Sequence, residues 1–167
     1  MTRAVLSLGS NIGDRLGHLQ LAVSGFADSL VAVSPVYETP PWGVTDQPDF
    51  LNAVLIAENA GFDEWDWLRR GQDLERQARR VREQHWGPRT LDVDVVSVGE
   101  VRSEHAELLL PHPGTPARAT VLVPWLAIDP DAVLPGHGRV DGLLHRLPAD
   151  DVAGVTRRDD LDLVAAA

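Results

Sequence analysis

Two carboxylates separated by one residue stand in a largely apolar stretch, WGPRTLDVDVV, at residues 86–96. Side chains two residues apart lie on the same face of a β-strand, so Asp92 and Asp94 are predicted to point the same way. Two like charges this close repel each other unless a cation lies between them. Mg²⁺ is the predicted cation, because it takes oxygen ligands and commonly uses one or two carboxylates together with substrate phosphates.

Arginines gather just before this strand. Arg80, Arg82 and Arg89 all lie within fifteen residues of the aspartate pair. Guanidinium groups hold anionic oxygens, and carboxylates that bind Mg²⁺ beside such groups are the parts of a phosphoryl-transfer site. The alternative is an ordinary exposed strand with polar residues at every second position, and the Asp-x-Asp spacing alone does not decide between the two.

A second unusual stretch, TPPWGVTDQPDFLNAV, begins at Thr39 and contains three prolines. Prolines reduce the entropy that a loop loses when it binds a ligand. After the loop, Phe50 and Asn52 share one face of a predicted strand, and they offer a ring for stacking and an amide with donor and acceptor edges. This pair suits a planar heterocycle such as a pterin or a purine. Alternatively, Phe50 anchors the core and Asn52 caps the strand end.

Composition narrows the class of protein. The 167 residues suit one domain over 1–167, with the tail at 148–167 as a candidate mobile segment. A formal net charge of −10 argues against a general nucleic-acid binder. The first residues do not resemble a signal peptide, no apolar run suits a membrane helix, and cysteine is absent. We therefore expect a cytoplasmic protein that binds small molecules and neither nucleic acid nor membrane, and a chain of this size is adequate as a monomer.

The order of predicted elements gives the fold class. Strands are predicted over residues 4–8, 30–37, 50–57 and 91–98, and helices over 16–30 and 63–83. The order β-α-β-β-α-β predicts an α+β, ferredoxin-like core, an antiparallel sheet with both helices on one face, followed by a C-terminal extension. In the last strand, Leu91, Val93 and Val95 are expected to face inward, and Val96 and Val98 to share the face of the aspartates. Residues 101–138 are expected to form a hairpin and a proline-rich loop, and 140–147 a short helix.

Four stretches together resemble one enzyme family. They are SLGSNIGDR, TPPWG with DQPDFLNAV, RRVREQHWGPRTLDVDVV, and LPHPGTPAR followed by VLVPW. Their collinear order over roughly residues 3–135 resembles 6-hydroxymethyl-7,8-dihydropterin pyrophosphokinase of folate biosynthesis. The resemblance implies a ferredoxin-like fold, ATP as co-substrate, two Mg²⁺ ions, and transfer of diphosphate from ATP to the pterin hydroxymethyl group with release of AMP.

The resemblance also implies roles for individual residues. Those that match the metal ligands are Asp92 and Asp94. Those that match the pterin pocket are Thr39, Pro41, Trp42, Phe50 and Asn52. Those that match the ATP site are Gln72, Glu75, Arg80, Arg82, Trp86, Arg89, His112 and Arg118. Those that match catalytic groups are Arg80, Arg82, Arg89 and Asp94.

One departure from the family pattern is Thr120, which stands where many members carry an aromatic residue. It supports an alternative in which the chain binds pterin or nucleotide but has lost catalysis. A second alternative is another Mg²⁺-dependent nucleotidyltransferase on a ferredoxin-like core. The reaction product distinguishes them, since only the pyrophosphokinase releases AMP together with a pterin diphosphate.

Overall fold

The structure, a computed structural model, describes residues 2–41, 46–81 and 90–165. Its helices and strands in chain order are β1 (Thr2–Ser10), α1 (Arg15–Gly25), β2 (Leu30–Val33), β3 (Tyr37–Thr39), β4 (Phe50–Asn59), α2 (Glu64–Val81), β5 (Asp92–Val98), β6 (Ser103–His105), β7 (Leu108–Leu110), the 3-10 helix η1 (Thr115–Ala117), α3 (Ala119–Ile128), β8 (Val133–Leu134), β9 (Gly138–Arg139), α4 (Val140–His145), α5 (Ala149–Ala153) and β10 (Thr156–Arg157).

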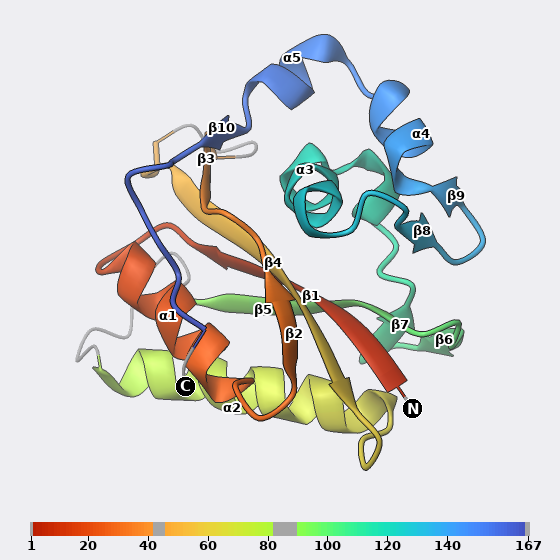
Figure 1. The fold of residues 1–167 in the computed structure, drawn as a ribbon. Helices are drawn as coiled ribbons and strands as arrows, with labels where there is room; N and C mark the ends of the chain where they lie inside the picture. The colour runs from red at the N-terminus through yellow and green to blue at the C-terminus, as the bar shows by residue number, and fades with distance from the viewer. Residues whose placement is uncertain (1, 42–45, 82–89, 166–167) are drawn as a thin grey trace.

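The main sheet has the order β10-β3-β4-β1-β5, with β2 also paired to β4, and neighbouring strands are antiparallel. If β2 and β3 are counted as one interrupted strand, this is the strand order of a ferredoxin-like core. Both α1 and α2 lie on the same side of the sheet (Figure 1). The predicted fold class and the placement of these two helices are therefore confirmed.

The face under α1 and α2 is closed by close packing. Trp67 of α2 is fully buried and its ring stacks on Phe26 with centroids 6.1 Å apart. Gly71 allows α2 to approach β5, because a Cβ there would lie 2.9 Å from Cγ1 of Val93. Leu91, Val93 and Val95 all belong to this core, as the alternation of the sequence predicted.

The opposite face is covered only in part. Helices α3 and α4 lie over it (Figure 1), and Leu122 and Trp125 pack there with Val54, Ile56 and Val96 of the sheet. Helix α3 stands where the sequence predicted a loop, and that prediction was wrong. The helix is apolar on nearly every side and contains Pro124, so it shows neither the amphipathic period nor the composition by which helices are usually recognised.

Two boundaries also differ from the predictions. The first helix ends at Gly25 instead of near Leu30, which begins β2. The strand predicted over 30–37 is interrupted at Pro35, which has no N–H for the ladder. Ser34 replaces part of the lost pairing, since its Oγ accepts a hydrogen bond from the N–H of Val54 at 2.9 Å.

A bulge changes the face of the last residues of β5. The pairing of β1 with β5 shifts between Val5 and Leu6, where Val5 lies opposite Ser97 but Leu6 lies opposite Val95. The extra residue, Val96, keeps the face of the aspartates, while Val98 joins the core under α1 and α2. The prediction that Val98 shares the aspartate face was therefore wrong, because strict alternation fails at a bulge.

The C-terminal residues add an edge strand to the sheet and contact α1. Strand β10 pairs with β3, and the chain beyond it runs alongside α1 (Figure 1). Gln20 of α1 holds Val164 by two hydrogen bonds, of 2.9 and 2.8 Å, between the side-chain amide and the backbone. The tail, a candidate mobile segment by sequence, contributes a helix, a strand and tertiary contacts within its described residues.

Candidate active site

A pocket of about 390 Å³ opens on the partly covered face, next to the start of α3. Its floor comes from β1, β3, β4 and β5, and its roof from residues 114–121, which include η1 and the start of α3. The residues that line it are Ser7, Leu8, Gly9, Thr39, Pro40, Phe50, Asn52, Asp92, Asp94, Gly114, Ala117, Arg118, Thr120 and Val121.

The strand register explains why these residues meet. Gly9 of β1 lies opposite Asn52 of β4 on one side and opposite Asp92 of β5 on the other. Ser7 lies opposite Asp94 in the next row of the same face. A Cβ at Gly9 would contact Asn52 Oδ1 at 3.4 Å, so the missing side chain leaves room between the amide and the carboxylates. Residues from three distant parts of the chain thus form one floor.

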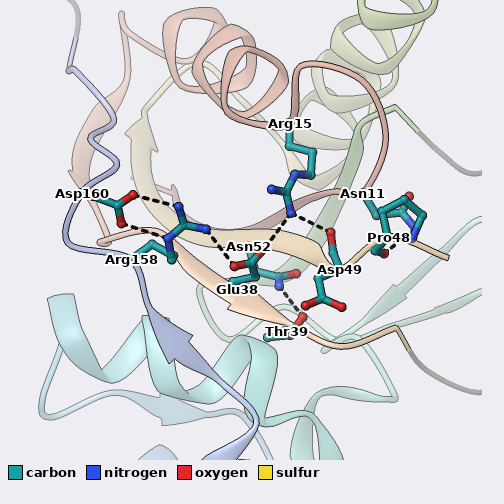
Figure 2. Close-up of polar contacts among 9 residues, drawn as sticks. All are labelled: Asn11, Arg15, Glu38, Thr39, Pro48, Asp49, Asn52, Arg158 and Asp160. Atoms are coloured by element: carbon teal, nitrogen blue, oxygen red, sulfur yellow. Dashed lines mark hydrogen bonds and ion pairs between the residues drawn. The ribbon is translucent and has the colours of Figure 1, made fainter. Parts of the chain in front are cut away.

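Asn52 and Thr39 form the polar centre of one wall. Asn52 Nδ2 donates a hydrogen bond of 2.7 Å to Thr39 Oγ1, and both side chains are buried. Figure 2 shows this contact beside the loop that joins β3 to β4. Phe50 lies opposite Thr39 in the register and lines the same pocket. The prediction that Phe50 and Asn52 share one face is confirmed, and the amide is oriented by a neighbour before any ligand arrives.

The aspartate pair forms the opposite wall. Asp92 and Asp94 are both half-buried, both line the pocket and stand on the edge strand of the sheet. The described residues contain no group of three or more His, Cys, Asp and Glu side chains placed to hold a metal. A cation here would therefore have two carboxylates from the protein and further oxygens from its substrate, which suits Mg²⁺.

Arg118 lines the pocket, whereas His112 does not, although His112 lies near enough to Asp94 and Arg118 for their charges to act on it. Burial lowers the pKa of His112 below its ordinary value, the charge of Asp94 opposes that change, and the charge of Arg118 adds to it. The imidazole is therefore uncharged at neutral pH. Arg118 is exposed and folds back over Gly114, where a Cβ would lie 2.8 Å from the guanidinium carbon. Its positive charge faces the pocket that it lines.

The remaining predicted residues do not line this pocket. Pro41 lines an adjoining cavity of about 250 Å³ that reaches α5. Gln72 is exposed on α2, on the other face of the sheet. Glu75 accepts a hydrogen bond of 2.9 Å from the backbone N–H of Val93, between the two aspartates. The side chains of Trp42, Arg80, Arg82, Trp86 and Arg89 lie outside the described residues, so the expectations for them remain predictions.

The sequence alone did not reveal the groups that fix the loop between β3 and β4. Arg15 at the start of α1 donates to Glu38 Oε2 at 2.8 Å and to the carbonyl of Asp49 at 2.9 Å, so it joins the two ends of the loop (Figure 2). Asn11 donates to Gln47 Oε1 at 3.0 Å. Both Asn11 and Arg15 belong to the stretch SLGSNIGDR, whose polar residues directly follow a strand, and this position was the available sequence signal for their role.

Comparison with known sequences now identifies the family. The sequence profile of the 7,8-dihydro-6-hydroxymethylpterin-pyrophosphokinases matches residues 5–130. The chain belongs to this family. A 2-amino-4-hydroxy-6-hydroxymethyldihydropteridine pyrophosphokinase from Mycobacterium leprae (strain TN) is 52% identical over 168 residues, covering 93% of this chain and 88% of that protein. The enzyme of that name from Mycobacterium tuberculosis (strain ATCC 25618 / H37Rv) is 50% identical over 143 residues, covering 80% and 76%.

Solved structures of pyrophosphokinase-type proteins share the fold. A crystal structure of Plasmodium falciparum HPPK-DHPS A437G with STZ-DHP matches with a TM-score of 0.66 at 12% identity. The match covers 87% of this chain and 45% of that one, so this chain spans less than half the length of that protein. The protein is a pyrophosphokinase by family, and the structural likeness independently confirms its α+β architecture.

Proposed function

We propose that the protein transfers diphosphate from ATP to the hydroxymethyl oxygen of 6-hydroxymethyl-7,8-dihydropterin, giving the pterin diphosphate and AMP, a step of folate biosynthesis. The observation that carries the proposal is the convergence in one pocket of two unlike walls. One presents an aromatic ring and an oriented amide, which suit a flat heterocycle, and the other presents paired carboxylates, which suit a metal-bound polyphosphate.

The residues proposed to bind the pterin are Phe50, Asn52 and Thr39. The Phe50 ring gives a stacking surface for the bicyclic ring. Since the Thr39 hydroxyl takes one amide proton of Asn52, the other amide proton and Oδ1 remain to pair with a donor–acceptor edge of the substrate. Thr120 lies across the pocket where an aromatic residue is common in the family, so stacking in this protein is proposed to occur mainly on Phe50.

Asp92 and Asp94 would hold Mg²⁺, with two ions proposed and ATP supplying further oxygen ligands. When bound, the metal supplies positive charge that offsets the phosphate charge and makes the β-phosphorus easier to attack. The hydroxymethyl oxygen attacks that phosphorus, the bond between the α,β-bridging oxygen and the β-phosphorus breaks, and AMP leaves with that oxygen. Asp94 is proposed to accept the hydroxyl proton at a carboxylate oxygen.

Cationic residues complete the proposed site. Arg118 lines the pocket and is proposed to hold phosphate oxygens, and His112 is proposed to contact ATP beside it. Arg80, Arg82 and Arg89 are proposed to stabilise charge on the transferring and leaving phosphates, and Gln72, Glu75 and Trp86 to lie near ATP. Trp42 and Pro41 are proposed to complete the pterin pocket.

A coupled AMP-release assay tests the reaction. The expected result is AMP formation with ATP, Mg²⁺ and the pterin alcohol together, and no comparable rate when the alcohol is omitted. Release of pyrophosphate with a nucleotidyl adduct would instead identify a nucleotidyltransferase. Tight binding of the pterin without turnover would identify a binding protein that has lost catalysis.

Helices that could cross a bilayer are absent from the described part of the chain, since none combines sufficient length with sufficient apolar character. We propose that the enzyme acts as a monomer in the cytoplasm. The absence of cysteine agrees with the proposed compartment, and 167 residues are enough for an enzyme of one chain. Sedimentation analysis at several protein concentrations tests the monomer, because a self-associating enzyme would sediment faster as the concentration rises.

A further inference from the structure

The C-terminal segment, residues 156–164, contacts the back of the pterin wall. Strand β10 pairs with β3, so that Thr156 lies opposite Glu38, and the N–H of Arg158 donates to the carbonyl of Val36 at 2.8 Å. Arg158 then reaches across with NH1 to Glu38 Oε1, also at 2.8 Å (Figure 2). A segment about 120 residues away in the chain is thereby tied to the residue that precedes Thr39.

Glu38 connects this contact to the pocket. Its carboxylate is shared, because Oε1 accepts from Arg158 and Oε2 accepts from Arg15. Successive side chains of a strand point to opposite faces, so Glu38 points away from the pocket while Thr39 points into it. The two arginines therefore fix the backbone of β3 from behind, and Thr39 in turn orients Asn52.

Arg158 is itself held in place. Its Nε and NH2 donate to the two carboxylate oxygens of Asp160 at 2.9 and 2.8 Å, which leaves NH1 for Glu38 (Figure 2). The side chains of Arg158 and Glu38 are 29% and 25% exposed, so the pair is largely shielded from water. Two parallel hydrogen bonds from one guanidinium group to one carboxylate fix the direction of the arginine side chain in addition to attracting the opposite charge.

The geometry points to a role for the C-terminal segment in the affinity for the pterin substrate: Arg158 is a positioning residue that acts through Glu38 on Thr39, Asn52 and Phe50. This inference rests on the proposed function. It extends the pterin site to residues beyond 5–130, the region that the family profile matches. Arg158 does not line the pocket. Its effect is expected on the binding of the pterin alcohol and not on the phosphates, which the opposite wall holds.

The chain offers a matched control in the neighbouring arginine. Arg157 pairs with Asp159 at 2.6 Å, as Arg158 pairs with Asp160, but it has no ion pair with Glu38. In β3 it lies opposite Tyr37, which does not line the pocket. Arg157→Ala therefore removes a similar charge and a similar local pair at the adjacent position without breaking the ion pair to Glu38.

The test measures KM for the pterin alcohol, KM for ATP and kcat for both variants. Because one shielded, charge-assisted contact is lost, we expect Arg158→Ala to raise KM for the pterin alcohol about fivefold, with kcat and KM for ATP within about twofold of wild type. Arg157→Ala should leave all three within about twofold. Equal pterin constants for the two variants would overturn the inference, and so would a fall in kcat alone.

A second pair of variants separates positioning from general stability. If Arg158 acts through Glu38, Arg158→Ala should raise the pterin KM in the wild-type background but produce no further rise in a Glu38→Ala background. Additive effects would overturn the inference. Binding of the pterin alcohol, followed by its fluorescence in the presence of a non-hydrolysable ATP analogue, gives a readout that does not require turnover, and thermal unfolding identifies any variant that fails to fold.

The same titration distinguishes this inference from the proposed function. A folded wild-type protein that binds no pterin alcohol would overturn both. Normal binding by wild type, together with identical affinities for Arg157→Ala and Arg158→Ala, would overturn only the role of the C-terminal segment.

Discussion

The two walls of the pocket are built in different ways. The pterin wall, Thr39, Phe50 and Asn52, is fixed from behind by ion pairs and hydrogen bonds that join α1, both ends of the connecting loop and the C-terminal segment. The phosphate wall, Asp92 and Asp94, stands on an edge strand that pairs with β1, and the N–H of Val93 between the two aspartates donates to Glu75. One wall has a shape set in advance, and the other presents charge.

This difference follows from what each wall is proposed to recognise. A flat, neutral ring offers little net charge, so selectivity depends on an amide and a ring held at fixed positions. A polyphosphate with its metal brings its own charge, and the protein needs to supply mainly opposite charges and ligand oxygens. Changes in the pterin wall should therefore act on KM for the alcohol, and changes in the phosphate wall on kcat.

The largest expected effect is at the phosphate wall. Asp94→Asn and Asp92→Asn remove one carboxylate each while keeping the shape of the side chain. We expect kcat to fall by about 1,000-fold or more in each, because the metal loses half of its protein ligands, with little change in pterin affinity. Steady-state AMP release at saturating substrates measures this effect.

The control for the aspartates is Glu100→Gln, which removes an exposed acid just beyond the other end of the same strand. It should leave kcat within about twofold of wild type, since surface charges of this kind contribute little. If Asp94→Asn retained turnover near that of the control, the phosphate wall would not hold the metal and the comparison between the walls would fail.

The next effect belongs to the pterin wall. Asn52→Ala removes the amide that is proposed to read the ring, and it leaves the Thr39 hydroxyl without its donor. We expect KM for the pterin alcohol to rise about 30-fold, equivalent to about 2 kcal/mol for lost hydrogen bonds, while kcat changes by less than about threefold. A variant with a kcat loss that exceeds its KM change would show that the two walls do not divide the work.

The sequence predicted which side chains of each wall share a face better than it predicted the contacts that support them. Period-two alternation was enough to place Asp92 with Asp94 and Phe50 with Asn52, because each pair lies within one strand. The strand order brings the pairs together, and the pattern of two helices and four strands predicted that order. Local sequence patterns were therefore sufficient to predict the core of the fold and which residues form each of the two walls.

What the sequence did not predict depends on contacts between distant residues. Nothing local to Arg158 indicates that it pairs with Glu38, and the bulge at Val96 is set by how β5 pairs with β1. Helix α3 was not predicted, because it is buried on several sides and so lacks the amphipathic stripe by which helices are recognised. Gly9 was not singled out, because its role as an open space appears only when Asn52 and Asp92 lie on either side of it.

A smaller effect is expected at the outer edge of the phosphate wall. Glu75→Ala leaves the N–H of Val93 without the acceptor that it has in the wild type. We expect the free energy of unfolding to fall by about 1–3 kcal/mol, the usual cost of a buried donor that loses its partner. Urea unfolding monitored by tryptophan fluorescence measures the change.

Glu75→Gln sharpens this experiment, because the amide oxygen still accepts a hydrogen bond from Val93 although the charge is gone. If Glu75 acts mainly by holding β5, the Gln variant should recover most of the stability and of kcat. If both variants lose activity equally while the Gln variant is stable, the charge of Glu75 itself acts on ATP, as the family resemblance implies.

The smallest effect is a pH dependence at the pterin wall. Hydrogen bonding to Arg15 and then to Arg158 lowers the pKa of Glu38 from its ordinary 4.5, although burial opposes this, and hydrogen bonding to Arg158 lowers that of Asp160 to about 2. A carboxyl whose pKa is lower in the folded state stabilises the fold above its unfolded pKa, and this contribution is lost as the pH falls through the folded value. The contribution of Glu38 is therefore complete above about pH 5 and declines below about pH 4.5.

Thermal unfolding of wild type and Glu38→Gln between pH 7 and pH 3 tests this sign. The wild-type midpoint should exceed that of the variant at pH 7, and the gap should narrow as the pH falls below 4.5, because protonation removes the same charge that the substitution removes. Both proteins will lose stability from other carboxylates, so the gap between them is the quantity that reports on Glu38. A gap that stays constant down to pH 3 would mean that the shared carboxylate adds no charge-dependent stability, and the pterin wall would then owe its shape to hydrogen bonds and packing alone.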